Sequence, residues 1–202
     1  MKEGILLIIS GASGAGKGTV IEELLRRMRA EGEEPYLSIS MTTRYMREGE
    51  KEGVSYYFTD KQNFEKLLSQ GGLLEHNCYN GEYYGSPKAP VEKALAEGRV
   101  VIFDIDLNGA RQIREHFPDA VTCFLVPPRF SDLEARLRGR GTETEEKIAK
   151  RLKIAEGEYA AAKSCDYVVR NAEIGDAADQ LESIIAAERC RTARRVELLN
   201  IQ

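Results

Sequence analysis

The sequence of 202 residues lacks a hydrophobic run long enough to span a membrane. The apolar run near its start, from Ile5 to Ile9, is far shorter than the roughly 20 residues that a membrane helix requires. The Gly-rich segment that follows does not resemble a signal-peptide cleavage site. We therefore expect a cytoplasmic protein with no membrane partner.

Cysteine is scarce, and it does not occur in pairs. The four cysteines lie tens of residues apart, and they are Cys78, Cys123, Cys165 and Cys190. Zinc sites and redox motifs usually contain a Cys-x-x-Cys pair, so the spacing indicates neither. Reduced thiols are the simpler interpretation.

Positive charge is not in excess either, because the formal net charge is -4. Non-specific binding to nucleic acid requires an excess of positive charge along one face. The composition thus argues against a nucleic-acid partner, and any site for a polyanion must be local.

The residues that are present are typical of one folded domain. Hydrophobic residues make up 42% and charged residues 31%, as in soluble globular proteins. A chain of this length can bury one good core, whereas several smaller domains would each be weakly stabilised. We expect residues 1–202 to form a single domain.

Strands and helices are predicted to alternate along most of the chain. Apolar runs predict strands at 5–10, 100–103, 121–126 and 167–169. Apolar residues at three- and four-residue spacing predict helices at 19–30, 109–116, 130–137, 145–162 and 176–194. The alternation predicts an α/β fold with a mostly parallel sheet and flanking helices.

The pattern changes between about residues 37 and 87. Tyrosines, glycines and short alternating stretches replace the long apolar runs there. We interpret this part as a strand-rich insertion that can rock against a core formed by residues 1–36 and 88–202.

A glycine-rich motif follows the first predicted strand directly. It comprises Gly11, Ala12, Ser13, Gly14, Ala15, Gly16, Lys17, Gly18 and Thr19, and it fits G-x-x-x-x-G-K. Glycines let backbone N–H groups point into one concavity, the following helix contributes its positive end, and the lysine reaches the outer phosphates. The motif predicts an ATP site, although a Gly-rich turn without a ligand is the alternative. Gly18 stands where P-loops carry a magnesium-binding hydroxyl, so Thr19 becomes the candidate ligand.

Two arginines, Arg44 and Arg47, indicate a second anion site. They lie three residues apart beside several hydroxyl residues. Guanidinium groups bind phosphate oxygens in pairs, and the hydroxyls of Tyr56 and Tyr84 can complete such a site without adding charge. The alternative is a solvated loop with two exposed arginines.

Asp104 ends an apolar strand, where P-loop enzymes place an acid that helps to hold Mg²⁺ through water. Asp106, two residues later, is expected on the same face. A turn residue at a strand end is the alternative for Asp104.

Further arginines, Arg136, Arg138 and Arg140, fall in one short stretch with Gly139 and Gly141 near the end of a predicted helix, and Arg151 lies in the next helix. The glycines would let residues 136–151 move as a lid. An exposed helix end with favourable positive charge would give the same local pattern.

In this order, the motifs resemble those of the guanylate kinases along nearly the whole chain. Besides residues 11–19, they are Ser40-x-Thr42-Thr43-Arg44-x-x-Arg47, Leu74-Glu75-His76, Tyr83-Tyr84-Gly85-Ser86, Asp104-Ile105-Asp106 and Leu137-Arg138-Gly139-Arg140-Gly141-Thr142. Ala12 and Asn108 depart from the residues that are frequent in that family. The resemblance implies transfer of the γ-phosphate of ATP to GMP, and also to dGMP, with Mg²⁺ as cofactor, in purine nucleotide metabolism.

The resemblance also implies roles for individual residues. Lys17, Arg44, Arg140 and Arg151 would serve catalysis, and Arg136 and Asn171 would bind ATP together with the P-loop. The GMP phosphate would be bound by Arg44, Arg47, Tyr56 and Tyr84, and the guanine by Ser40, Glu75, Ser86 and Asp106. Carboxylates suit guanine because its N1–H and N2 amine are hydrogen-bond donors.

Two other functions fit parts of the pattern. One is a P-loop kinase for another nucleoside monophosphate, against which Glu75, Ser86 and Asp106 argue. The other is a non-catalytic scaffold that binds phosphorylated partners, against which Lys17 and the lid arginines argue. The sequence leaves open whether the protein is a monomer or a homo-oligomer.

Overall fold

A five-stranded sheet forms the centre of the molecule. The computed structural model describes residues 4–139 and 144–199. The strand order is β2-β7-β1-β8-β9, and every neighbouring pair is parallel. The strands are β1 (Ile5–Ser10), β2 (Tyr36–Leu37), β7 (Val100–Asp104), β8 (Val121–Val126) and β9 (Tyr167–Arg170). The predicted α/β class with a mostly parallel sheet is confirmed.

Helices cover both faces of this sheet, because its central strand is apolar on both sides. All six residues of β1 are buried. Ile5, Leu7 and Ile9 join the core cluster that includes α1 and α7, whereas Leu6 and Ile8 join the cluster of α3 and α4. These helices are α1 (Lys17–Ala30), α3 (Lys88–Ala96), α4 (Leu107–His116) and α7 (Ile174–Glu188). A strand buried on both faces has a continuous apolar sequence, as residues 5–9 do.

The parallel arrangement brings two of the sequence motifs together. β1 and β7 are paired in register, with Ile9 opposite Asp104. The glycine-rich loop leaves β1 at the same edge of the sheet at which β7 ends. Ligands of open α/β sheets bind at this carboxyl edge.

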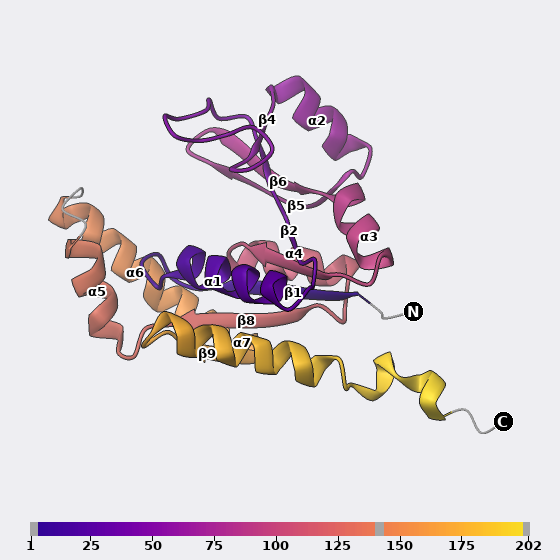
Figure 1. Ribbon diagram of the computed structural model, residues 1–202. Coiled ribbons are helices and arrows are strands. Elements are labelled where there is room, and N and C mark those ends of the chain that lie inside the picture. Colours follow the sequence, from indigo (N-terminus) through magenta and orange to yellow (C-terminus); the bar gives the residue numbers. More distant parts are fainter. Residues whose placement is uncertain (1–3, 140–143, 200–202) are drawn as a thin grey trace.

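A second, smaller sheet lies to one side of the first, as Figure 1 shows. Its strand order is β4-β3-β6-β5, with β3 and β4 parallel and the other pairs antiparallel. Its elements are β3 (Met41–Thr42), β4 (Tyr57–Phe58), α2 (Lys61–Ser69), β5 (Leu73–Tyr79) and β6 (Glu82–Pro87). Phe64 of α2 is fully buried and stacks on Tyr83, with 5.3 Å between the ring centroids.

The helices α5 (Phe130–Gly139) and α6 (Glu145–Ala161) pack on the glycine-rich loop. Leu133 and Leu137 of α5 share a buried cluster with Ala12 of that loop and with Ile148 and Ala155 of α6. The loop is therefore held between the core sheet and these two helices.

The predicted helix at 176–194 is wrong at its end. Helix α7 ends at Glu188, and the chain continues in two 3₁₀ turns, Thr192–Arg194 and Val196–Leu199. There, Arg194 turns back to donate a hydrogen bond to the Gly4 carbonyl oxygen at 3.1 Å. Ile185 is the last buried apolar residue of α7. The residues after Glu188 that were predicted to continue the helix therefore have no apolar face to pack against the core.

Two helices were not predicted. Helix α2 begins at Asp60, whose side chain accepts a hydrogen bond from the Asn63 N–H, and it buries only Phe64. Helix α3 buries only Val91 and Ala94. Such short helices carry little periodic signal. Within the described ranges, no helix is both long and apolar enough to cross a lipid bilayer.

Candidate active site

The glycine-rich loop adopts a conformation that depends on glycine. Gly16 caps α1 with φ 90°, a left-handed conformation that costs other residues energy. A Cβ atom at Gly16 would lie 2.6 Å from the Asn171 side-chain nitrogen. Gly14 also has positive φ, and its α-carbon faces Leu133 and Leu137 of α5. The spacing of these glycines thus reflects both backbone geometry and close packing.

Lys17 lies in the first turn of α1 and reaches back over the loop. Its Nζ donates a hydrogen bond to the Gly11 carbonyl oxygen at 2.9 Å and lies 3.6 Å from Asp104 Oδ1. The Asp104 side chain is 41% exposed, so this ion pair faces solvent at the edge of the sheet. An anion that enters this edge would meet the lysine charge and the N-terminal end of α1 together.

Residues far apart in the sequence converge on the loop. The buried Asn171 donates through Nδ2 to the Ala15 carbonyl oxygen at 2.8 Å. Arg136 donates to the same oxygen at 3.3 Å and to the Asn171 carbonyl oxygen at 3.2 Å. Arg151 donates to Ser13 Oγ at 3.1 Å. Residues predicted for the ATP side are therefore brought together.

The remaining arginines of this region differ in position. Arg140 lies outside the described residues. Arg138 is paired with Glu134 of α5 and Glu145 of α6, each at 2.9 Å. Arg138 thus links the two helices to each other and not to the loop.

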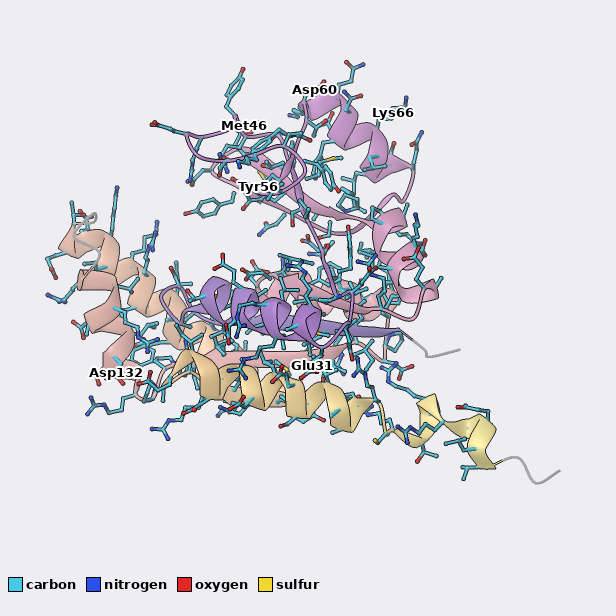
Figure 2. The ribbon with its side chains drawn as sticks, viewed as in Figure 1. Glu31, Met46, Tyr56, Asp60, Lys66 and Asp132 are labelled. Atoms are coloured by element: carbon cyan, nitrogen blue, oxygen red, sulfur yellow. The ribbon has the colours of Figure 1, made fainter. Side chains whose placement is uncertain are left out.

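A cleft of about 410 Å³ lies between the two sheets. In Figure 2, Tyr56 lies nearer the core than Met46 of the same region does. The lining residues come from both sheets, and they are Ser40, Arg44, Arg47, Tyr56, Glu75, Asn77, Tyr79, Tyr84, Asp104, Ile105 and Asp106. The cleft therefore contains all residues predicted for the acceptor except Ser86.

Arg44 is held in place from several sides. Its guanidinium group forms two hydrogen bonds to Glu50, at 2.7 and 3.0 Å, and lies 5.4 Å from the centre of the Tyr56 ring. This pairing lowers the pKa of Glu50 to about 2 and raises the pKa of Arg44 above its ordinary value. The fixed orientation suits a bidentate contact with an oxyanion.

Glu75 is the buried acid of the cleft, with 6% of its surface exposed. Ser86 Oγ donates to Glu75 Oε1 at 2.7 Å, which explains why Ser86 lies behind the cleft and not in its lining. Burial raises the pKa of Glu75, the hydrogen bond from Ser86 lowers it, and the charge of Asp106 raises it. The carboxylate is thus a buried acceptor whose ionised form is disfavoured by burial and favoured by its hydrogen bonds from Ser86.

Asp106 lies beside Glu75 at the start of α4. Its Oδ1 accepts a hydrogen bond from the Gly109 N–H at 2.8 Å. A Cβ atom at Gly109 would lie 3.3 Å from Glu75 Oε2 and 3.5 Å from Asp106 Oδ1. The two carboxylates thus flank one glycine, and a donor-rich ligand could contact both.

The residues predicted for magnesium are Thr19 and Asp104. Thr19 is exposed in the first turn of α1, and Asp104 ends β7 beside Lys17. No group of three or more His, Cys, Asp or Glu side chains that could hold a metal ion occurs in the part of the chain that the structure describes.

The sequence interpretation missed three lining residues of the cleft, and also Glu50, which pairs with Arg44. Glu50 follows Arg44 by six positions in a loop that also contains Glu48 and Glu52, so no local signal singles it out. Asn77 and Tyr79 alternate with Glu75 along β5, so the period of two would have placed them on the same face. Ile105 could have been predicted to line the cleft only from its position between Asp104 and Asp106.

The chain is similar to known proteins over most of its length. The guanylate kinase family model matches residues 3–188. A guanylate kinase of Carboxydothermus hydrogenoformans is 44% identical over 194 residues, which are 96% of this chain and 93% of the relative. One of Thermus thermophilus is 46% identical over 198 residues, 98% of this chain and 88% of the relative.

A solved structure is similar as well. The crystal structure of guanylate kinase from Anaplasma phagocytophilum is 32% identical in sequence and gives a TM-score of 0.75. The similarity covers 96% of this chain and 90% of that chain. It therefore includes both sheets and the helices that pack on the glycine-rich loop.

Proposed function

This chain belongs to the guanylate kinase family and catalyses the ATP-dependent phosphorylation of GMP to GDP, and we propose that its two facing sites divide the reaction between them. The glycine-rich loop with Lys17 binds the donor, and the cleft between the sheets binds the acceptor. The observation that carries this division is the cleft itself, because one space contains both Arg44 and Glu75 and is bordered by Asp104 of the donor edge.

On the donor side, the triphosphate of ATP lies in the loop of residues 11–19. Backbone N–H groups at the start of α1 and the Lys17 ammonium neutralise the phosphates. Asn171 and Arg136 hold the loop through their hydrogen bonds to the Ala15 carbonyl oxygen, and they border the adenosine part. Charge on the transferring phosphoryl group is thus met by groups that are already oriented.

On the acceptor side, the cleft recognises the two ends of GMP separately. Arg44, Arg47, Tyr56 and Tyr84 hold the phosphate, and Glu75 accepts hydrogen bonds from the N1–H and N2 amine of guanine. Asp106 and Ser40 complete the base site, while Ser86 acts through Glu75. Adenine has no such pair of donors, so it would leave a buried carboxylate unsatisfied, which is costly.

The acceptor phosphate needs no strong base, because its oxygen is already an anion at neutral pH. Positioning and charge neutralisation are therefore the work of the protein. In this proposal, Arg151 and Arg140 contribute charge at the transferring group, as lid arginines that are worth about 10³–10⁵ in rate in related chemistry. Residues 136–151 would close over ATP and exclude water, which would otherwise compete with GMP.

Mg²⁺ fits this site as a companion of ATP. Mg²⁺ keeps several waters and is usually bound by one or two carboxylates together with substrate phosphates. Asp104 would hold it through water, and Thr19 is the hydroxyl nearest to Gly18 in the motif. When bound, the ion would neutralise phosphate charge. The free thiols of the four cysteines also suit the cytoplasm as the place of the reaction.

A coupled assay of ADP formation tests the proposal. Wild-type protein with ATP and Mg²⁺ is given GMP, AMP, UMP or CMP, and Lys17→Ala is compared with Lys93→Ala, whose lysine is exposed on α3. We expect turnover with GMP that Lys17→Ala removes and Lys93→Ala retains. Turnover with another nucleotide would contradict the base site, and binding of GMP without ADP formation would favour a scaffold.

A further inference from the structure

Glu75 lies at an irregular position of its strand. The regular pairing of β5 with β6 breaks between Leu73 and His76. Within this break β5 contributes two residues, the second of which is Glu75, whereas β6 contributes only Ser86. An extra residue of this kind, as in a β-bulge, bends the strand and can aim a side chain at a site. Strand pairing alone therefore does not fix the direction of the Glu75 carboxylate.

A side chain of helix α4 holds the same part of β5. In the order of the described strands, β5 stands at the edge of the smaller sheet, and edge strands present unpaired N–H and C=O groups. Gln112 accepts a hydrogen bond from the His76 N–H and donates one to the His76 carbonyl oxygen, each at 3.1 Å. A side-chain amide carries the same donor and acceptor as a peptide group. Gln112 thus takes the place of a neighbouring strand at the residue after Glu75.

Helix α4 also carries the second acid of the proposed base site, because Asp106 caps it. A Cβ atom at Gly109 of this helix would lie 3.3 Å from Glu75 Oε2. Gly109 and Gln112 are three residues apart and therefore lie on one face of the helix. This face meets β5 at two points, which are the Glu75 carboxylate and the backbone of the next residue.

We propose that Gln112 is a positioning residue of the acceptor site, which holds β5 on α4 and thereby keeps the Glu75 carboxylate beside Asp106. The inference rests on the proposed function, in which both acids belong to the base site. Arg44 and Arg47 lie in the segment between β3 and β4, away from this contact. Loss of the two hydrogen bonds should therefore weaken recognition of the base and leave recognition of the phosphate intact.

Gln180 of α7 is a matched control. It makes the same pair of hydrogen bonds, each at 3.1 Å, to the N–H and the carbonyl oxygen of Arg170 on β9, an edge strand of the core sheet. Like Gln112, it is half-buried. The acceptor cleft is lined by residues between Ser40 and Asp106, so β9 and α7 lie outside its lining. Gln180→Met therefore removes the same pair of bonds away from the cleft.

Equilibrium binding of GMP, IMP and AMP, without ATP or Mg²⁺, tests the inference. IMP lacks the N2 amine of GMP, and AMP offers neither of the two guanine donors. Gln112→Met should weaken the binding of GMP by about three- to tenfold, in the range of an ordinary hydrogen bond, and leave the binding of AMP unchanged. The preference for GMP over IMP should fall with it. Gln180→Met should retain the wild-type affinity for all three nucleotides.

Thermal melting of the same variants separates positioning from a loss of stability. A purely structural role predicts that Gln112→Met and Gln180→Met both lower the melting temperature and that neither changes the ratio of the GMP and IMP affinities. Gln112→Asn is a second variant, which keeps the amide but shortens its reach by one methylene group. It should reduce the preference for GMP over IMP as Gln112→Met does.

The outcomes that would contradict the account differ from one another. If wild-type protein binds GMP no better than AMP, the acceptor site is wrong and the proposed function fails. If wild-type protein prefers GMP but Gln112→Met keeps the full preference over IMP, the proposed function stands and the positioning role is overturned. Equal weakening of all three nucleotides by Gln112→Met would also overturn it, because the effect would not depend on the base.

Discussion

The two sheets of this molecule carry proposed sites that differ in composition: one consists mainly of backbone groups and the other of side chains. At the edge of the core sheet, the proposed donor site is made mainly of backbone, in a loop fixed by Gly14 and Gly16 between β1 and α1. In the cleft under the second sheet, the proposed acceptor site is made of side chains, such as Arg44, which pairs with Glu50, and Glu75, which accepts a hydrogen bond from Ser86.

The difference follows from what each site has to recognise. A triphosphate tail is the same in every nucleoside triphosphate, so N–H groups and a helix end suffice to bind it. Guanine must be distinguished from other bases, which requires oriented side chains whose polar atoms are left unpaired by the wrong base. Changes to the donor site should therefore affect the rate of phosphoryl transfer, and changes to the acceptor site should affect the choice of acceptor.

The largest effect is expected for Lys17→Ala. Loss of the ammonium group removes charge stabilisation at the transferring phosphate, so kcat should fall by about 10²–10³-fold. The KM for GMP should not change, since Lys17 lies outside the lining of the cleft. Steady-state kinetics with GMP varied at saturating ATP measure both values. A variant with normal kcat and a raised KM for GMP would contradict the assignment of ATP and GMP to two separate sites.

Glu75→Gln is expected to have the next largest effect. The amide replaces one acceptor oxygen of the carboxylate with an NH₂ donor and removes the negative charge. The kcat/KM for GMP should therefore fall by about 10–100-fold, as for a lost hydrogen bond to a charged group. Competition between GMP and AMP at equal concentration reports the selectivity, which should decrease. Glu65→Gln, at an exposed position of α2, is the control and should behave as wild type.

A smaller effect is expected for Glu50→Gln. Without the carboxylate, Arg44 loses the partner that orients it, and the KM for GMP should rise by about three- to tenfold, in the range of one ordinary hydrogen bond. The preference for GMP over AMP should be retained, because Glu50 acts on the phosphate end of the cleft. Loss of base selectivity in this variant would show that the two ends of the cleft are not separate.

The smallest effect concerns pH. Burial raises the pKa of Glu75, so its ionised form is lost at a higher pH than for an ordinary glutamate, whereas the pKa of Glu50 is about 2 and its pair with Arg44 persists in mild acid. The KM for GMP should therefore rise, as the pH falls, before the pH reaches the usual glutamate pKa. The KM for ATP should stay constant, and Glu75→Gln should abolish the rise for GMP. A rise that persists in this variant would assign the titration to another group.

Most of the core sheet was predicted from the sequence, except its two-residue strand β2, Tyr36–Leu37. Continuous apolar runs at 5–10 and 121–126 match β1 and β8, because strands buried on both faces leave a strong signal. The second sheet was indicated only by a change in the residue pattern of the sequence. Its strands β3 and β4 are two residues long and α2 buries one side chain, so they leave little periodic signal. Their positions depend on pairing across the sheet, which periodicity does not contain.

The site shows the same contrast. The residues of the glycine-rich loop could be named from one continuous motif, and their conformation follows from it. Two contacts depend on where side chains meet after folding. Arg44 pairs with Glu50, and Ser86 lies behind Glu75, to which it donates a hydrogen bond. Local spacing could suggest an anion site there, but not which acid would hold its arginine.

Isothermal titration calorimetry of two ligands with two variants tests the central claim most directly. GMP and a non-hydrolysable ATP analogue are each titrated into wild type, Lys17→Ala and Glu75→Gln. The account predicts a crossed result, in which Lys17→Ala weakens only the ATP analogue and Glu75→Gln weakens only GMP. If either variant weakened both ligands equally, the donor and acceptor sites would not be the separate structures described above.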